Sequence, residues 1–327
     1  MRKPRIAILG ATGVVGREIT KITEELNVEF ESIKFLSSAK SAGSKITFKG
    51  QEYTVIEATP EVFDDVDIVM ASAGGSTSQK FAPEIVKRGG VIIDNSSAFR
   101  MEKDVPLVIA GVNDEDLRKH EGIIANPNCS TSQLMLPLKA LDEKYKVKRL
   151  IVSTYQAVSG AGMQGIADLE DGLKGVEPKK FPYPIAGNCL PHIDVFLDNG
   201  YTKEEVKMIN ETQKILHDDS IKITATAVRV PVLNCHAESI NIELEKPYEL
   251  EDVVKLLEST KGIVVYDDTK ELKYPTQLQV SGKDEVYVGR IRRDFSIDNG
   301  LNLWVVGDNI RKGAALNAIQ IAEEIIK

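Results

Sequence analysis

The feature that most restricts the fold of this chain is a glycine-rich turn close to its N-terminus. Gly10, Gly13 and Gly16 follow directly on the apolar run Arg5 to Leu9 and open a stretch, Val14 to Leu26, whose apolar residues recur at helical spacing. A strand, a glycine turn and a helix in this order place free backbone N–H groups at a helix N-terminus, where they can bind a pyrophosphate. The sequence therefore predicts a dinucleotide-binding unit that begins at the first strand.

Short apolar runs alternate with helical patterns as far as residue 124, which predicts a largely parallel sheet covered by helices on both faces. The cap of the last predicted helix in this region is Asn113. The predicted strands are 32–36, 66–70 and 91–93, the predicted helices are 79–88 and 113–120, and a hairpin is expected around Lys49 and Gly50.

The pattern changes in the second half, where longer alternating runs predict an antiparallel or mixed sheet with one helix-covered face. These runs are 150–155, 221–230, 239–245, 286–292 and 301–306. The segment 172–190 holds three prolines and is expected to be a surface loop or an arm that reaches a partner subunit. We expect an α/β chain with an N-terminal Rossmann-type parallel sheet (residues 1–127 plus a helix at 310–327) and a second α+β domain (128–309).

Composition narrows the classes of partner. The chain has 327 residues with 41 Lys and Arg against 49 Asp and Glu, a net charge of −8 that disfavours nucleic acid and anionic membranes as partners. Its three cysteines form no disulfide framework and no cluster with metal-site spacing, so a cytoplasmic protein without a metal is expected.

The end of the second predicted strand indicates which dinucleotide is bound. An NAD site usually has an acidic residue there to hold the ribose 2′-OH. In this chain the position reads Ser37-Ser-Ala-Lys40-Ser41, and hydroxyls with a cation suit a 2′-phosphate. NADP(H) is therefore the expected cofactor.

Cys129 is the strongest candidate for a reactive side chain. It precedes a helix that we expect to open at Ser130 or Thr131, and free N–H groups at a helix N-terminus stabilise a thiolate. The other two cysteines, Cys189 and Cys235, are expected to be ordinary buried packing residues. A thiolate beside a nicotinamide points to acyl chemistry.

Such a nucleophile needs a group that exchanges protons near neutral pH. Of four histidines, His236 is the best candidate, because it lies between two strand-like runs, whereas the other three lie in polar or loop contexts. Arg229 lies in the first of these runs. An arginine in an apolar strand is costly unless it is paired, so it either bridges to an acid or binds a carboxylate.

Two further charged sites stay open on spacing alone. Glu204 and Lys207 lie one helical turn apart, in a helix opened by a capping box between Thr202 and Glu205, and their simplest interpretation is an exposed ion pair. Arg100 follows a short parallel-type strand and either holds an anion or is an ordinary loop cation.

Six motifs in order resemble one known family over the whole chain. They are GATGVVGRE at the first turn, NSSAFRM before residue 102, NPNCST around Cys129, YQAVSGAG from Tyr155, the EEVK helix, and RVPVLNCH from Arg229 to His236. Together they resemble the aspartate-β-semialdehyde dehydrogenases, in the shorter bacterial branch.

The resemblance implies a role for each matching residue. Cys129 resembles the nucleophile that forms a thioester, His236 the acid/base catalyst and Gln156 the residue that orients the substrate. Arg229 resembles the clamp on the substrate α-carboxylate and Glu204 the residue that faces its amino group. The resemblance further implies phosphate contacts at Arg100, Lys207 and Asn128, and NADP contacts at Gly10, Thr12, Gly13, Val14, Val15, Ser37, Lys40, Ser41, Ser159, Gly160 and Asn309.

The implied reaction is the NADPH-dependent reduction of L-4-aspartyl phosphate to aspartate semialdehyde by a homodimer that acts on small molecules. Three alternatives remain at this point. An N-acetyl-glutamyl-phosphate reductase or a relative of glyceraldehyde-3-phosphate dehydrogenase would share the layout, and a non-catalytic NADP sensor would use the glycine turn alone.

Overall fold

The computed structural model describes residues 2–326 and shows two compact units, which we describe separately. The first unit comprises the chain up to Pro127 together with the residues from Ala314 onward, and the second runs from Asn128 to Gly313. The predicted division differs by a few residues at the second crossing, which it set at 310, and its end residues 1 and 327 lie outside the described range.

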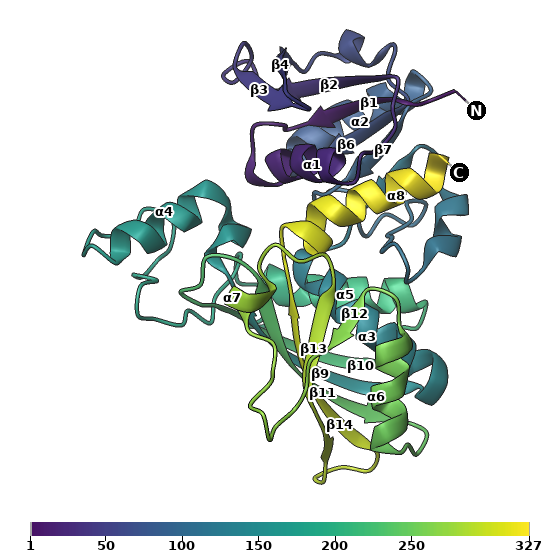
Figure 1. Ribbon diagram of the computed structural model, residues 1–327, viewed down its shortest axis with the longest axis vertical. Helices are drawn as coiled ribbons and strands as arrows, with labels where there is room; N and C mark the ends of the chain where they lie inside the picture. The colour runs from purple at the N-terminus through teal and green to yellow at the C-terminus, as the bar shows by residue number, and fades with distance from the viewer. Residues whose placement is uncertain (1, 327) are drawn as a thin grey trace. The chain divides into compact units, whose positions relative to one another are not determined.

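The first unit contains a parallel sheet of six strands in the order β5-β2-β1-β6-β7-β8 (Figure 1). The strands are β1 (Arg5–Leu9), β2 (Ser32–Ser37), β5 (Ile56–Glu57), β6 (Ile68–Ala71), β7 (Val91–Asp94) and β8 (Ile123–Ala125), with a hairpin of β3 (Lys45–Phe48) and β4 (Gln51–Thr54). The helices are α1 (Val14–Glu25), α2 (Gly75–Lys87) and α8 (Leu316–Ile326).

Alternation along β1 explains why both faces of this sheet are covered. Ile6 and Ile8 belong to a core that includes Ile19 of α1 and Ile319 of α8. Ala7 and Leu9 point the other way, into a second core with Phe81, Ala82 and Ile85 of α2. The predicted Rossmann-type arrangement is confirmed, and the strand order reverses beside β1, where such sheets bind ligands.

The second unit contains a mixed sheet of six strands in the order β10-β9-β11-β14-β13-β12. The strands are β9 (Val147–Gln156), β10 (Lys222–Arg229), β11 (His236–Leu244), β12 (Ile263–Val265), β13 (Val286–Asp294) and β14 (Gly300–Gly307). The helices are α3 (Cys129–Tyr145), α4 (Gly162–Gly172), α5 (Lys203–Leu216), α6 (Leu250–Ser259) and the short α7 (Gln277–Val280). Helices α3, α5 and α6 cover one face, as Figure 1 shows.

Five predicted details differ from the structure. The helix expected at 113–120 is a 3-10 helix (Asp114–Lys119), and the Asn113 side chain does not cap it, because its Oδ1 accepts from Ile109 N–H instead. The last helix is preceded by a π-helical turn at Arg311–Ala315. The run expected to continue to residue 230 ends at Arg229, and His236 itself opens β11.

Candidate active site

The predicted glycine turn joins β1 to α1 and leaves no room for side chains. Gly10 has a φ of +87°, and a Cβ there would lie 3.0 Å from the backbone of Ser72 and Ala73. A Cβ on Gly16 would lie 2.2 Å from the carbonyl oxygen of Gly10. The N-cap of α1 is Gly13, whose lack of a side chain leaves the first N–H groups of the helix without a side-chain partner. These features suit close approach of a pyrophosphate.

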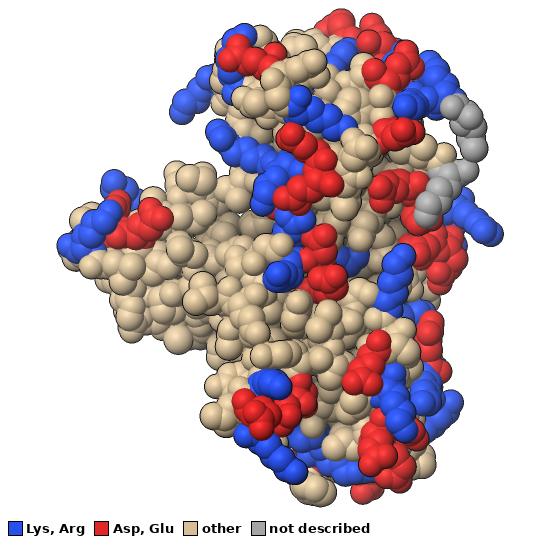
Figure 2. Space-filling view, in the orientation of Figure 1, with Lys and Arg blue, Asp and Glu red and all other residues tan. Residues whose placement is uncertain are grey.

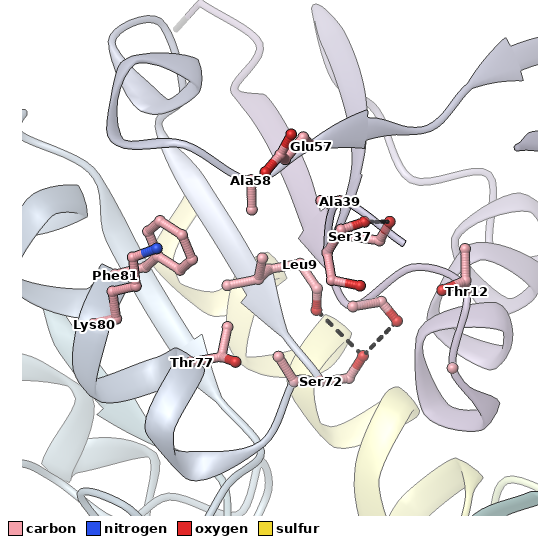
Figure 3. Close-up of a pocket in the computed structure, with 14 residues that line it drawn as sticks. Leu9, Thr12, Ser37, Ala39, Glu57, Ala58, Ser72, Thr77, Lys80 and Phe81 are labelled. Carbon is pink, nitrogen blue, oxygen red and sulfur yellow. Dashed lines mark hydrogen bonds between the residues drawn. The ribbon is translucent and has the colours of Figure 1, made fainter. Parts of the chain in front are cut away.

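A cavity of about 450 Å³ lies at the carboxyl ends of β1, β2 and β6, beside this turn (Figure 3). Of the predicted cofactor residues, Gly10, Thr12, Gly13 and Ser37 line it. The loop directly after β2 contributes Ser38 and Ala39 and no carboxylate at the position where an NAD site usually has one, although Glu57 of the neighbouring β5 also lines the cavity.

The other predicted cofactor residues of this unit lie beside the cavity rather than in its lining. Lys40 and Ser41 follow in the next turn, where Ser41 N–H donates to the carbonyl of Ser38. Val14 and Val15 form the first turn of α1, and Val15 packs on the core. Sequence reasoning missed Ser72, which follows β6, and Thr77 and Lys80 of α2, all of which line the cavity. The available signal was a pair of glycines, Gly74 at the N-cap of α2 and Gly75 as its first residue.

In the second unit, the ends of three adjacent strands and the start of α3 bring the predicted catalytic residues together. Gln156 ends β9 and Arg229 ends β10, which is parallel to it, while His236 opens β11, which is antiparallel to β9. All three therefore lie at one edge of the sheet. Cys129 is the first residue of α3, one position earlier than expected, and its Sγ lies 3.2 Å from Nε2 of His236.

The surroundings of His236 fix its proton. The ring is completely buried, and its Nδ1 accepts a hydrogen bond of 3.1 Å from the Ala157 N–H. Burial, followed by the positive charge of Arg229, lowers the pKa of His236 to about 3. The imidazole is therefore neutral, and because Nδ1 is an acceptor its proton is on Nε2, directed at the sulfur.

This burial makes the stability of the protein sensitive to acid. Between pH 6.5 and about 3 the native chain binds no proton at His236, whereas an unfolded chain does. The free energy of unfolding should therefore fall as the pH drops through this window, and above pH 6.5 His236 should cause no loss of stability. The slope should be at most about 1.4 kcal/mol per pH unit. Urea unfolding of wild type and His236→Gln at several pH values checks it: the variant should lack this part of the slope, and identical slopes would contradict the buried neutral ring.

Asn128 holds the nucleophile's helix in place through all its polar groups. Its Oδ1 accepts from Ser130 N–H at 2.9 Å and so caps α3. Its backbone N–H donates to Glu211 at 2.7 Å, and its Nδ2 donates to Glu204 at 2.9 Å. Glu211 was not predicted, although it lies two helical turns after Glu204 on the same face of α5.

Glu204 is buried, so the simple interpretation of an exposed ion pair is wrong for it. Burial alone raises the pKa of this carboxyl, but Lys207 and hydrogen bonds from Gln156 and Asn128 outweigh burial and bring the pKa below its usual range. Lys207 lies 3.2 Å from Glu204 and 2.7 Å from Asp194. Burial lowers the pKa of Lys207, and these two carboxylates more than compensate, so both groups of the pair are charged.

Arg229 is a buried cation with unused hydrogen-bonding capacity. One terminal nitrogen donates to the Ala157 carbonyl at 2.6 Å, whereas Nε has no partner. Within residues 2–326, no carboxylate forms an ion pair with it. Burial lowers the pKa of the guanidinium, whereas the negative charges of Glu204 and Cys129 act to raise it. A buried donor without a partner is costly, so this position suits an anionic ligand.

Gln156 and Gly160 border the same space. Gln156 donates through Nε2 to Ser130 Oγ at 2.7 Å and to Glu204 at 3.1 Å, and its buried Oε1 has no partner. A Cβ on Gly160 would lie 3.0 Å from Arg229 and 3.3 Å from the His236 ring. A side chain at residue 160 would therefore crowd both groups.

The remaining predicted residues fall in two places. Asn309 donates to Ser159 at 3.0 Å and accepts from Cys235 N–H at 2.9 Å, just behind His236. Arg100 belongs to the first unit, where it is buried and donates to the carbonyls of Asn126 and Asn95. A shared phosphate site with Lys207, in the second unit, stays a prediction.

The two cysteines outside the site differ from each other. Cys235 is buried, as expected, and burial raises the pKa of its thiol well above the ordinary value. Cys189 is exposed, so its expected packing role is wrong. It lies in an irregular segment whose apolar contacts come from its neighbours Ile185 and Leu190 instead.

Comparison with known proteins decides between the alternatives. Residues 5–120 match the family model for the semialdehyde dehydrogenase NAD binding domain, and residues 138–312 match the one for the dimerisation domain. Aspartate-semialdehyde dehydrogenases from Aquifex aeolicus and Bacillus subtilis are 51% and 48% identical to the chain, over 99% and 98% of it and 98% and 97% of the relatives. The chain belongs to the aspartate-semialdehyde dehydrogenase family.

Solved structures agree with this assignment. Aspartate semialdehyde dehydrogenase II from Vibrio cholerae, complexed with ASA, has a TM-score of 0.96 at 43% identity and covers 100% of this chain and 99% of its own. The Candida albicans enzyme with NADP has a TM-score of 0.80 at 27% identity, over 99% of this chain and 98% of its own. The predicted fold, the oxidoreductase class and the NADP(H) cofactor are confirmed, and the alternative of a non-catalytic sensor is excluded.

Proposed function

We propose that this chain reduces L-4-aspartyl phosphate to L-aspartate 4-semialdehyde with NADPH, reversibly and through a thioester on Cys129, a step that supplies lysine, methionine and threonine biosynthesis. The observation that carries the proposal is the distance of 3.2 Å between the Cys129 sulfur and Nε2 of a neutral His236, beside a buried arginine whose Nε has no hydrogen-bond partner. The names of the relatives support the same substrate.

The thiolate of Cys129 attacks the acyl carbon and expels phosphate, and cations stabilise the leaving group. Lys207, Arg100 and Asn128 are assigned to the phosphate. Asn128 also caps α3 and so fixes the first turn of that helix. When bound, NADPH would supply a hydride, which converts a thioester into the oxyanion of a thiohemiacetal. As this oxyanion re-forms the carbonyl, the C–S bond breaks, the aldehyde leaves and the thiolate returns, which accepts a hydrogen bond from the Nε2–H of His236.

Binding of the substrate also adjusts the acid/base group. The charge of Arg229 is the second cause of the low pKa of His236. A substrate α-carboxylate on Arg229 offsets that charge, which raises the pKa of His236 towards the range where it exchanges protons. Glu204 is assigned to the substrate ammonium, and Gln156 to the reacting carbonyl through its unpartnered Oε1.

A substrate assay tests the proposal. Purified protein should reduce NADP in a phosphate-dependent way with aspartate semialdehyde, and not with N-acetylglutamate semialdehyde. The opposite preference would identify the chain as an N-acetyl-glutamyl-phosphate reductase. A rate with glyceraldehyde 3-phosphate equal to that with aspartate semialdehyde would favour a relative of glyceraldehyde-3-phosphate dehydrogenase.

Lys40 and Ser41 are assigned to the 2′-phosphate of NADP, with Ser159, Gly160 and Asn309 as contacts from the second unit. Lys40→Ala should lower kcat/KM for NADP by about tenfold and leave kcat/KM for NAD unchanged, because one charge-assisted contact is lost. Lys45→Ala, at an exposed lysine of the nearby hairpin, is the matched control. Equal losses with both coenzymes would remove Lys40 from this role.

We propose further that the chain acts as a cytoplasmic homodimer on these small molecules. The match to a dimerisation domain supports self-association. Leu173, Val176 and Tyr183 are exposed on the segment after α4, where Figure 2 shows a surface with few charges except at its tip. This is the segment expected to reach a partner subunit. None of the helices in residues 2–326 is long and apolar enough to cross a membrane.

A further inference from the structure

Three buried oxygen atoms behind the catalytic pair have no hydrogen-bond partner as ordinary acceptors. They are both carboxyl oxygens of Glu238 and Oε1 of Gln133. Glu238 has no exposed surface, and Gln133 is 1% exposed. A buried oxygen without a donor is expensive, and three such atoms in one place require an explanation.

The two side chains face each other at the back of the site. Glu238 follows His236 by two residues on β11, so both point to the helix-covered face of the sheet. Gln133 follows Cys129 by one helical turn on α3, and its Nε2 donates to the backbone carbonyl of His236 at 3.2 Å. The carboxyl group of Glu238 is within hydrogen-bonding reach of the Gln133 side chain.

The space around Gln133 is closed by Gly307. A Cβ on Gly307 would lie 2.9 Å from Oε1 of Gln133 and 3.0 Å from its Cβ. The amide is thus enclosed between the start of β11, the end of β14 and α3 itself. It joins the helix that carries the nucleophile to the strand that carries the imidazole.

A proton on Glu238 removes the buried negative charge and gives Oε1 of Gln133 a donor. An ionised Glu238 would bury a full negative charge whose one nearby donor is the second N–H of Gln133, and it would leave Oε1 of Gln133 with no donor at all. A neutral Glu238 donates its O–H to Oε1 and leaves Nε2 free to hold the His236 carbonyl, as observed. Burial raises the pKa of Glu238 well above its usual value and outweighs the contact with the Gln133 amide, which lowers it.

We propose that Glu238 is a positioning residue: as a neutral acid it donates to Oε1 of Gln133 and thereby fixes the amide that holds His236 beside Cys129. The inference rests on the proposed roles of Cys129 and His236. The neighbours of Glu238 across the sheet are Thr154 and Val305, neither of which is charged, and the residue of α3 that faces Glu238 is Gln133. Within residues 2–326, no charged side chain contributes to its pKa. The nearest titratable group on its own strand is His236.

Two uncharged substitutions test whether Glu238 acts as a hydrogen-bond donor. Glu238→Gln keeps a donor for Gln133 and should keep kcat within about twofold and the pH profile unchanged. Glu238→Leu has a similar volume and no donor, and should lower kcat by about tenfold, equivalent to about 1.4 kcal/mol of barrier, with KM within about twofold. Equal losses in both variants, or full kcat in E238L, would overturn the proposal.

A spectroscopic readout tests the same point without turnover. The infrared difference spectrum of wild type minus E238Q, at about pH 8 and so roughly four units above the usual Glu pKa, should contain the carbonyl band of a protonated carboxylic acid. A carboxylate band instead would overturn the proposal, even if E238L proves too unstable to assay. Wild type that shows the acid band but no activity with aspartate semialdehyde would refute the proposed function and leave the protonation state established.

Discussion

Cys129→Ser should lower the phosphate-dependent reduction of NADP with aspartate semialdehyde by at least about 10³-fold. A serine hydroxyl is ionised only if a base takes its proton. In the free enzyme the ring of His236 does not accept it, because its Nε2, the nitrogen that faces residue 129, already has a proton. Cysteine differs because the N-terminus of α3 stabilises its thiolate, which is itself the nucleophile.

The measurement is the initial rate of NADPH formation, followed by absorbance. Cys189→Ser is the matched control: the same change at an exposed cysteine should leave the rate within about twofold. Iodoacetamide should inactivate wild type and the control alike, and should not label position 129 in C129S. Turnover of C129S close to that of wild type would rule out a covalent role for Cys129.

Arg229→Lys should raise KM for aspartate semialdehyde by about tenfold or more and change KM for phosphate by less than about twofold. The guanidinium is buried and has an unpartnered Nε, so it can present a planar pair of donors to the α-carboxylate. Lysine keeps the charge and loses the paired geometry, which costs one strong hydrogen bond, or about 1.5 kcal/mol.

Steady-state kinetics with each substrate varied in turn separate the two constants. Arg292→Lys, on an exposed position of β13, is the control and should change neither. If the two KM values rise together in R229K, the arginine acts on the phosphate or on the general geometry of the site, and the carboxylate assignment fails.

The sequence predicted the features that depend on near neighbours in the chain. The glycine turn, the start of α3 within one residue and the capping box of Thr202 with Glu205 all lie within a few residues, where spacing determines geometry. The resemblance to the family added roles, but it did not describe the contacts through which the residues act.

Burial and long-range contacts escaped prediction because they depend on which segments pack together. Spacing on α5 gave an exposed ion pair for Glu204, whereas packing of α5 against α3 buries it beside Asn128. Cys189 was expected to be buried because free cysteines usually are, although it lies in the segment 172–190 that was itself expected to be a surface loop. The pairing of Glu238 with Gln133 joins positions 105 residues apart by count (238 − 133), and no local pattern indicates it.

The two hydrogen bonds between α5 and Asn128 limit how this helix can move. Glu204 accepts from the Asn128 side chain and Glu211 from its backbone N–H, and both glutamates belong to the same helix. A ligand or substitution that shifts α5 along its axis must therefore alter both hydrogen bonds at once. Because Asn128 caps the helix that begins with Cys129, such a shift changes the first turn of α3 and the position of the Glu204 carboxylate together.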